Sequence, residues 1–316
     1  MLRRVTQSQL EAEIARRPGL IPVAFRSVRG EVIWLDLNQF HCSEGFFGDS
    51  LAVYSQQRGA QREWFLSAFE TLLSPAAAEG CIRPTGFIFH AGRCGSTLLA
   101  KALASCVRNL VFSEAAPHNQ IWEVLEVLRA NGEGMPGIGA YRGLAVLMGR
   151  PRVASYSAHF IKFTSYNIVQ YRYIREAFPD VPALFLYREP GEMLASYRTG
   201  PPGWLGSDMG LGMKWSAAEE AVEAFFQTAL SIHEPHFRCM DYRSLTPESL
   251  PAILKYFRLE PTEDELLAMR GEFAWDAKSG LKQRPFVRIA RDIPPAPSRL
   301  NLLYERLKSH AALILR

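Results

Sequence analysis

The sequence predicts an α/β fold, and three features of the chain support this prediction. Residues 86–104 contain a short apolar strand, a turn bounded by glycines and an amphipathic helix. Residues 183–197 repeat this order, because an apolar run leads to Pro190, which suits the first turn of a helix. The chain has 316 residues and is 48% hydrophobic, which is enough to bury one large α/β domain, or one domain with an appendage.

The first part of the chain, residues 1–80, carries no chemical motif and predicts a small accessory region beside a main domain of residues 81–316. A short helix is expected over residues 5–17 and a β-hairpin over residues 23–37. A second helix is expected over residues 61–73. Packing on the main domain is the expected role of this region, and a substrate-facing cap is the alternative.

The turn at residues 91–95 predicts a phosphate ligand. Gly92 and Gly95 allow backbone angles that other residues avoid, so successive N–H groups and the positive end of the next helix can hold an anion. A nucleoside triphosphatase loop would place Lys directly after its last glycine. Here Ser96 follows Gly95, and the cation is Arg93, whose planar guanidinium can bind a phosphate or sulfuryl oxygen. A glycine-rich turn without a ligand is the alternative.

The second strand-to-helix unit also ends on a cation. Arg188 follows the apolar run directly, and Ser196 falls in the second turn of the helix that Pro190 begins. Both side chains could therefore converge on one phosphate. An enzyme that binds a magnesium nucleotide would place an acid at this strand end, where Glu189 is the only nearby substitute.

A candidate general base lies between these two motifs. Residues 109–114 form an apolar run that ends on the carboxylate of Glu114. Ligands of parallel sheets collect beyond the carboxyl ends of the strands, so Glu114 is placed where a base could act. A helix cap or a surface acid before Pro117 is the alternative. Another strand is expected over residues 158–163, with Lys162 near its end.

Taken together, the two motifs resemble those of the sulfotransferases that use 3′-phosphoadenosine 5′-phosphosulfate (PAPS). The 5′-phosphosulfate loop of that family reads roughly [KR]-x-G-[ST]-[ST], and its 3′-phosphate motif reads R-x-P-x-x-x-x-x-S. The residues that match are Arg93, Cys94, Gly95, Ser96 and Thr97 in the first motif and Arg188, Pro190 and Ser196 in the second. The resemblance covers about residues 81–290 and implies a P-loop type three-layer fold with a central parallel sheet.

The resemblance also bears on the catalytic residues. Cytosolic members end the strand that corresponds to residues 158–163 in Lys-Thr-His, and that His is the base. Lys162 fits this pattern, but the His position holds Thr164, whose hydroxyl cannot act as a base near neutral pH. The resemblance therefore implies Arg93, Lys162 and Glu114 as catalytic residues, with Glu114 as the base. The alternatives for the base are His118 and His159.

Three further cofactor contacts are carried over from the resemblance. Tyr242 matches the tyrosine of a Y-E-D-L strand end and would flank the adenine, although the acids of that motif are missing. Family members close the 3′-phosphate site with a basic loop near the carboxyl terminus, for which residues 278–284, with Lys282 and Arg284, are the candidate. Residues 270–316 carry ten Lys or Arg against four Asp or Glu. A solvated basic face is the alternative for this segment.

The resemblance implies a sulfotransferase that moves a sulfuryl group from PAPS to a hydroxyl or amine of a small-molecule acceptor, without a metal. A metal-dependent phosphotransferase and a non-catalytic nucleotide-binding protein are the alternatives. The net charge of +4 does not call for a nucleic-acid partner. The five cysteines form no C-x-x-C pair, and no segment approaches the roughly 20 apolar residues of a membrane span. A cytoplasmic protein without a membrane span is expected.

Overall fold

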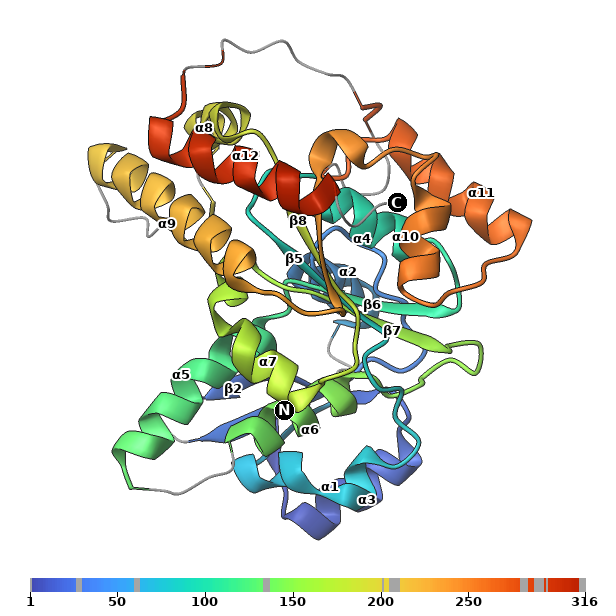
Figure 1. The fold of residues 1–316 in the computed structure, drawn as a ribbon. Helices are drawn as coiled ribbons and strands as arrows, with labels where there is room; N and C mark the ends of the chain where they lie inside the picture. The colour runs from blue at the N-terminus through green and yellow to red at the C-terminus, as the bar shows by residue number, and fades with distance from the viewer. Residues whose placement is uncertain are drawn as a thin grey trace. The chain divides into compact units, whose positions relative to one another are not determined.

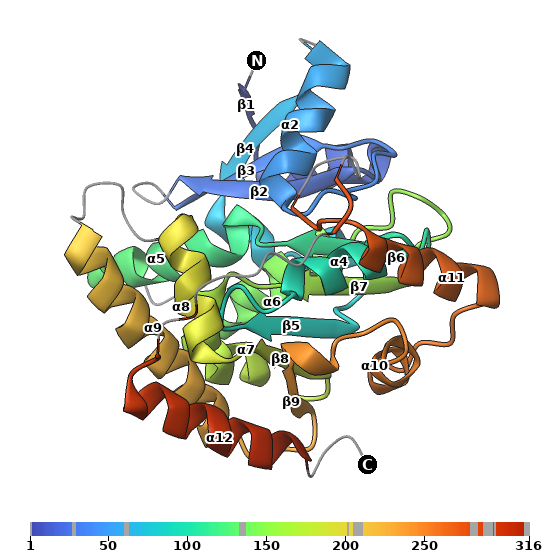
Figure 2. The same cartoon turned by 90° about the horizontal axis from the view of Figure 1, so that it is seen from above.

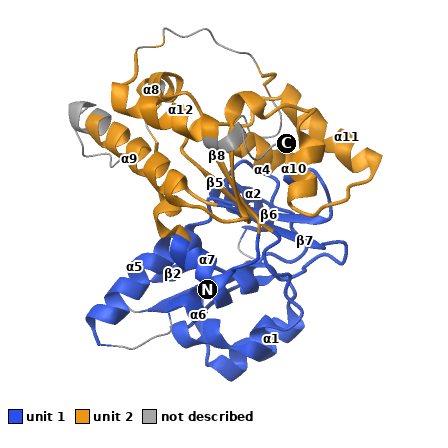
Figure 3. Cartoon of the chain, in the orientation of Figure 1, with its two compact units in different colours: residues 1–85, 103–162, 172–181 blue, residues 86–102, 163–171, 182–316 orange. Residues whose placement is uncertain are grey.

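The computed structural model describes most of the chain. The described residues are 2–26, 30–59, 63–132, 137–200, 202–204, 211–278, 284–286, 293 and 295–312, without the side chains of 199, 211–215 and 310–312. Internal contacts divide the chain into two compact units, and each is described by itself (Figure 3). Unit 1 comprises residues 1–85, 103–162 and 172–181, and unit 2 comprises residues 86–102, 163–171 and 182–316. The predicted boundary at residue 80 stays a prediction.

A five-stranded parallel sheet is the central element, in the order β6-β7-β5-β8-β9 (Figures 1 and 2). The strands are β5 (Gly86–His90), β6 (Asn109–Ser113), β7 (Ala158–Lys162), β8 (Ala183–Tyr187) and β9 (Phe237–Asp241). Every residue of the first four of these strands is buried, as expected for a parallel sheet that is covered on both faces. The predicted α/β fold with a central parallel sheet is therefore confirmed.

Helices flank the sheet, and Figure 1 labels most of them. The α-helices are α1 (Gln7–Arg16), α2 (Phe47–Arg58), α3 (Pro75–Ala78), α4 (Ser96–Ala104), α5 (Ala116–Ala130), α6 (Gly137–Met148), α7 (Tyr171–Ala177), α8 (Pro190–Thr199), α9 (Leu211–Ser231), α10 (Leu250–Tyr256), α11 (Glu263–Gly271) and α12 (Ser298–Ala312). Short 3₁₀ helices are η3 (Phe69–Leu73), η4 (Ser165–Gln170), η5 (Tyr242–Ser244) and η6 (Glu272–Ala274). Along the described residues, no helix has the length and apolarity needed to cross a membrane.

Unit 1 contains a second sheet, in the order β1-β4-β3-β2. Its strands are β1 (Leu2–Arg4), β2 (Leu20–Arg26), β3 (Glu31–Asp36) and β4 (Trp64–Ala68). The predicted hairpin is confirmed, because β2 and β3 pair antiparallel. The predicted helix over residues 61–73 is wrong where β4 lies, and residues 69–73 form the short 3₁₀ helix η3. Strand β4 pairs antiparallel with β3, and its adjacent residues Phe65 and Leu66 are both buried, so apolar side chains on both faces of a covered strand imitate a helical stripe.

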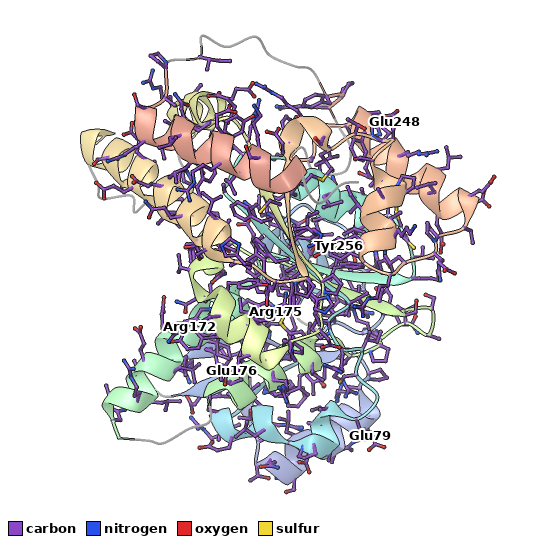
Figure 4. All side chains as sticks on the ribbon, in the orientation of Figure 1. Glu79, Arg172, Arg175, Glu176, Glu248 and Tyr256 are labelled. Atoms are coloured by element: carbon purple, nitrogen blue, oxygen red, sulfur yellow. The ribbon has the colours of Figure 1, made fainter. Side chains whose placement is uncertain are left out.

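Two side chains labelled in Figure 4, Tyr256 and Arg175, hydrogen-bond to main-chain carbonyls within their own units. In unit 2, the Tyr256 hydroxyl lies 3.0 Å from the carbonyl oxygen of Ala183, at the start of β8, and 2.9 Å from that of His236, just before β9. In unit 1, the Arg175 guanidinium donates to the carbonyl oxygens of Phe178 at 3.0 Å and of Val181 at 2.8 Å. These contacts satisfy carbonyls where strands begin and where α7 ends.

Candidate functional site

The predicted phosphate loop joins β5 to α4 in unit 2, as the sequence indicates. Gly92, Arg93 and Gly95 have φ angles of +91°, +53° and +79°, so three residues within four positions adopt left-handed backbone conformations. Glycine takes this conformation freely, whereas a residue with a side chain such as Arg93 is strained by about 1–3 kcal/mol. Strained residues of this kind persist only where the surrounding structure holds them, and they are common at ligand-binding sites.

Both glycines are also required by close packing. A Cβ atom on Gly92 would lie 2.0 Å from the hydroxyl oxygen of Tyr197, which donates a 3.1 Å hydrogen bond to the carbonyl of Ala91. A Cβ atom on Gly95 would lie 2.8 Å from the ring of Tyr242. Two aromatic side chains, one from α8 and one from the segment after β9, therefore rest directly on the loop.

His90, the last residue of β5, hydrogen-bonds to the loop through its ring. Sequence reasoning missed this contact. Its Nδ1 atom lies 3.0 Å from the amide nitrogen of Gly92, and its Nε2 atom lies 2.9 Å from the carbonyl oxygen of Phe163. Because an amide N–H only donates and a carbonyl only accepts, the ring carries its proton on Nε2 and accepts at Nδ1. A polar residue that ends an otherwise apolar strand is the sequence signal that could have identified it.

The loop side chains are not all directed alike. The guanidinium of Arg93 donates to the carbonyl of Gly200 just after α8 and lies 5.8 Å from the ring of Tyr197. Cys94 is fully buried, and its thiol donates to the carbonyl of Leu186 at 3.1 Å. Cys94 can therefore face a ligand only through its backbone. The hydroxyl residues that begin α4 are buried; these are Ser96 and Thr97.

Arg188 brings the two sequence motifs together. Its Nη1 atom donates to the carbonyl oxygen of Arg93 at 3.2 Å, across 95 positions of the chain. Its guanidinium also lies 4.6 Å from the centre of the Tyr242 ring, within the range of a cation–π interaction. Arg188, Tyr242 and the loop are therefore neighbours within unit 2.

Two further charged residues adjoin Arg188, and sequence reasoning missed both. A carboxylate oxygen of Glu192 accepts from Nε of Arg188 at 2.5 Å, and its second oxygen accepts from Arg243 at 3.1 Å. Burial raises the pKa of Glu192, but the hydrogen bonds and charges of the two arginines outweigh it and hold that pKa below its usual value. Arg188 precedes the predicted helix and Glu192 lies in its first turn, and their separation by four residues could have indicated the pair.

The remaining predicted cofactor contacts are Ser196, Lys282 and Arg284. Ser196 is buried on α8, whose first N–H groups are already capped, since Glu189 accepts from Gly191 at 2.9 Å and from Glu192 at 2.7 Å. Arg284 is exposed, and its carbonyl accepts from the amide of Asp276 at 2.9 Å. Lys282 lies outside the described residues. The roles of these residues in cofactor binding stay predictions.

The predicted base and the predicted lysine meet in unit 1. Lys162, the last residue of β7, forms an ion pair with Glu114, directly after β6, and its carbonyl accepts from the Glu114 amide at 2.7 Å. The Lys162 side chain is fully buried, whereas that of Glu114 is 23% exposed. Glu114 has a φ of +51°, a strained value for a residue with a side chain. The ammonium also lies 5.1 Å from the ring centre of Phe46. The carboxylate is thus held in one place while keeping access to solvent.

The two histidines considered as alternative bases are buried in unit 1. Burial lowers the pKa of His118 to about 3, with a further contribution from the His159 charge, and lowers the pKa of His159 to about 4. The His159 ring also lies 3.2 Å from the carbonyl oxygen of Ile82 through Nδ1. Both rings are therefore neutral at physiological pH, and their burial keeps them away from solvent.

We expect these histidines to make the fold less stable in acid. Their folded-state pKa values lie below the ordinary 6.5, so the unfolded chain takes up protons first as the pH falls. The free energy of unfolding should decrease between pH 6.5 and pH 4 by up to about 1.4 kcal/mol per pH unit for each histidine. Chemical denaturation at several pH values should show a shallower decrease for His118→Gln and for His159→Gln. The exposed His233→Gln is the control, and equal slopes in all variants would contradict the assignment.

Comparison with known proteins places this fold. Sulfotransferase STF9 from Mycobacterium avium matches with a TM-score of 0.51 and 12% identity, covering 98% of this chain and 96% of that chain. Sulfotransferase STF1 from Mycobacterium tuberculosis H37Rv has a TM-score of 0.47 and 12% identity, with 96% and 98% covered. A sulfotransferase domain from the curacin biosynthetic pathway has a TM-score of 0.46 and 17% identity, with 72% and 99% covered.

By sequence, no family model matches the chain, and no curated protein matches it significantly. The match to STF9 spans nearly the whole of both chains, so the chain has a sulfotransferase-like α/β fold. At this level of identity, a shared fold does not carry the activity with it.

Proposed function

We propose that this protein is a sulfotransferase that uses PAPS as donor and a hydroxyl or amine of a small molecule as acceptor. One observation carries the proposal: Arg188 of the second motif donates to the loop of the first motif at Arg93 and stacks on Tyr242. The two motifs that resemble the family's 5′-phosphosulfate and 3′-phosphate sites are therefore adjacent within unit 2. The sulfotransferase-like fold is consistent with this assignment.

The residues present in unit 2 fit such a nucleotide. The loop is closely packed, since both of its glycines lie against aromatic side chains that leave no room for a Cβ atom. The Gly92 N–H donates to His90, so the donors suited to a phosphate would be the backbone N–H groups after it and those that begin α4. Arg188 would bind the 3′-phosphate, and Tyr242 would flank the adenine. When bound, PAPS supplies the sulfuryl group and leaves as adenosine 3′,5′-bisphosphate.

Proton transfer is assigned to the Glu114–Lys162 pair of unit 1. The Glu114 carboxylate would take the proton that the acceptor loses as its oxygen or nitrogen bonds to sulfur. Lys162 holds this carboxylate through the ion pair, and its positive charge would stabilise charge on the transferring group. Both histidine side chains are buried, whereas the Glu114 side chain is 23% exposed, and this access supports Glu114 over either histidine as the base.

A thermal shift panel tests the proposal against its alternatives. A sulfotransferase should be stabilised by adenosine 3′,5′-bisphosphate without Mg²⁺, because a ligand that binds only the folded state raises the unfolding temperature. A phosphotransferase should instead respond to ATP together with Mg²⁺. No response to either nucleotide would contradict both enzymatic assignments. Screening a metabolite extract for sulfated products after addition of PAPS would then identify the acceptor.

Replacement of Arg188 tests the 3′-phosphate assignment. We expect Arg188→Ala to weaken binding of adenosine 3′,5′-bisphosphate about tenfold or more, since a charged hydrogen bond is worth about 1.5–3 kcal/mol. Turnover at saturating PAPS should fall much less, because the 3′-phosphate does not react. Calorimetric titration measures the affinity, and Arg299→Ala, which removes the exposed partner of Glu223, is the control. Unchanged affinity in Arg188→Ala would show that another residue binds the 3′-phosphate.

A further inference from the structure

The carboxylate of Glu192 lies between two arginines of different elements. Arg188 follows β8, and Arg243 lies in the short helix η5 after β9. One carboxylate oxygen accepts from Arg188 at 2.5 Å and the other accepts from Arg243 at 3.1 Å. The carboxylate side chain is 9% exposed, whereas the side chains of Arg188 and Arg243 are 21% and 58% exposed. These three side chains carry a net charge of +1, and the Asp241 carboxylate, which accepts from the Arg243 amide at 2.8 Å, lies beside Arg243.

This arrangement has the features of an anion-binding site. Arg188 is held in place by the loop carbonyl of Arg93 and by the ring of Tyr242. Arginine binds carboxylate and phosphate oxygens with the same planar set of donors, so either anion can satisfy the two guanidinium groups. In this structure the Glu192 carboxylate accepts from both arginines and so occupies the position that an anion would take.

We propose that the 3′-phosphate of the nucleotide binds by replacing the Glu192 carboxylate between Arg188 and Arg243. Arg243 is then a phosphate-binding residue, and Glu192 is a built-in competitor for the site. This inference rests on the proposed function, because it takes a nucleotide with a 3′-phosphate as the ligand.

The exchange accounts for the charges in both states. Without nucleotide, Glu192 pairs with the partly buried guanidinium of Arg188 and with the exposed one of Arg243, which avoids leaving the Arg188 charge unpaired. With nucleotide, a phosphate dianion meets two arginines, and the displaced carboxylate repels it. Removing the carboxylate charge should therefore tighten 3′-phosphate binding, and removing Arg243 should weaken it.

The test compares two nucleotides by calorimetric titration of the full chain. Adenosine 3′,5′-bisphosphate carries the 3′-phosphate, and adenosine 5′-phosphate lacks it. Glu192→Gln should bind the bisphosphate about three- to tenfold more tightly, and Arg243→Ala should bind it about five- to tenfold more weakly. Neither variant should change the affinity for adenosine 5′-phosphate by more than about twofold. Glu223→Gln, which loses an ion pair with Arg299, is the matched control and should bind both nucleotides like the parent.

Several outcomes would overturn the inference. Unchanged or weaker binding of the bisphosphate by Glu192→Gln would mean that Glu192 positions Arg188 and does not compete with the ligand. Equal losses for both nucleotides in Arg243→Ala would assign Arg243 a structural role. If Glu192→Gln does not fold, Glu192→Asp serves instead: its side chain is shorter by one methylene, which weakens the contact with both arginines and should also tighten bisphosphate binding.

Failure of the inference and failure of the proposed function are distinguishable. If the parent binds the bisphosphate and Arg188→Ala loses it, the function stands even when Glu192→Gln changes nothing. If the parent binds neither nucleotide, both the function and the inference fail.

Discussion

Glu114→Gln is expected to slow the chemical step by about 10²- to 10⁴-fold, because glutamine keeps the shape of the side chain but cannot accept the acceptor's proton. Donor affinity should change by less than about twofold, since Glu114 is not assigned to nucleotide binding. Single-turnover kinetics with saturating PAPS would measure the step. Glu126→Gln, an exposed change on α5, is the control. Turnover at the parental rate would assign the base to another residue.

Glu114→Gln also removes the carboxylate that forms an ion pair with the buried Lys162 ammonium. Breaking a buried pair in this way costs about 3–5 kcal/mol of stability. The double variant Glu114→Gln with Lys162→Met removes both charges and should recover part of that loss. If the double variant unfolds at the parental temperature but stays slow, the loss of activity is chemical. Recovery of activity together with stability would contradict the role of Glu114 as base.

Gly92→Ala is expected to destabilise the fold by about 2–5 kcal/mol and to abolish nucleotide binding, because the new Cβ atom meets both backbone strain and a steric clash. The φ of Gly92 is +91°, and the nearest atom, the hydroxyl oxygen of Tyr197, would lie 2.0 Å away. Chemical denaturation and titration with adenosine 3′,5′-bisphosphate would measure the two effects.

Two companion variants separate the strain from the clash. Gly132 has a φ of +76°, and a Cβ atom added there would meet no heavy atom within 4 Å. Gly132→Ala therefore reports the backbone strain alone. Adding Tyr197→Phe to Gly92→Ala leaves the ring carbon Cζ at 3.2 Å as the nearest atom and should restore about 1–2 kcal/mol. If Gly92→Ala costs no more than Gly132→Ala, the packing of Tyr197 on the loop is not a constraint.

The parts of the candidate site that follow from local sequence were predictable. Gly92, Gly95 and Arg188 stand in short strand-to-helix patterns, and the structure places the two glycines in the loop between β5 and α4 and Arg188 directly after β8. These patterns depend only on residues close together in the sequence, so the two strand-to-helix turns could be predicted without knowing the rest of the fold.

The parts that depend on distant contacts were not predictable in the same way. Arg243 meets Glu192 across 51 positions, and nothing near either residue indicates its partner. The prediction of a helix where β4 lies failed for a related reason. A strand covered on both faces has no alternating pattern, so its pairing with β3 decides its structure. Helix α12 was also not predicted, because the basic charge of its segment indicates a solvated surface, whereas Leu300 and Leu307 are fully buried.

The bracing of the 91–95 loop by α8 has a consequence for motion. Tyr197 hydrogen-bonds to Ala91 within the loop, and the Arg93 guanidinium donates to the carbonyl of Gly200 where α8 ends. Local opening of the loop must break these contacts, so the loop and the helix open as one cooperative segment. A ligand that reduces opening of the loop will therefore also slow fraying at the end of α8, although the two segments are far apart in the sequence.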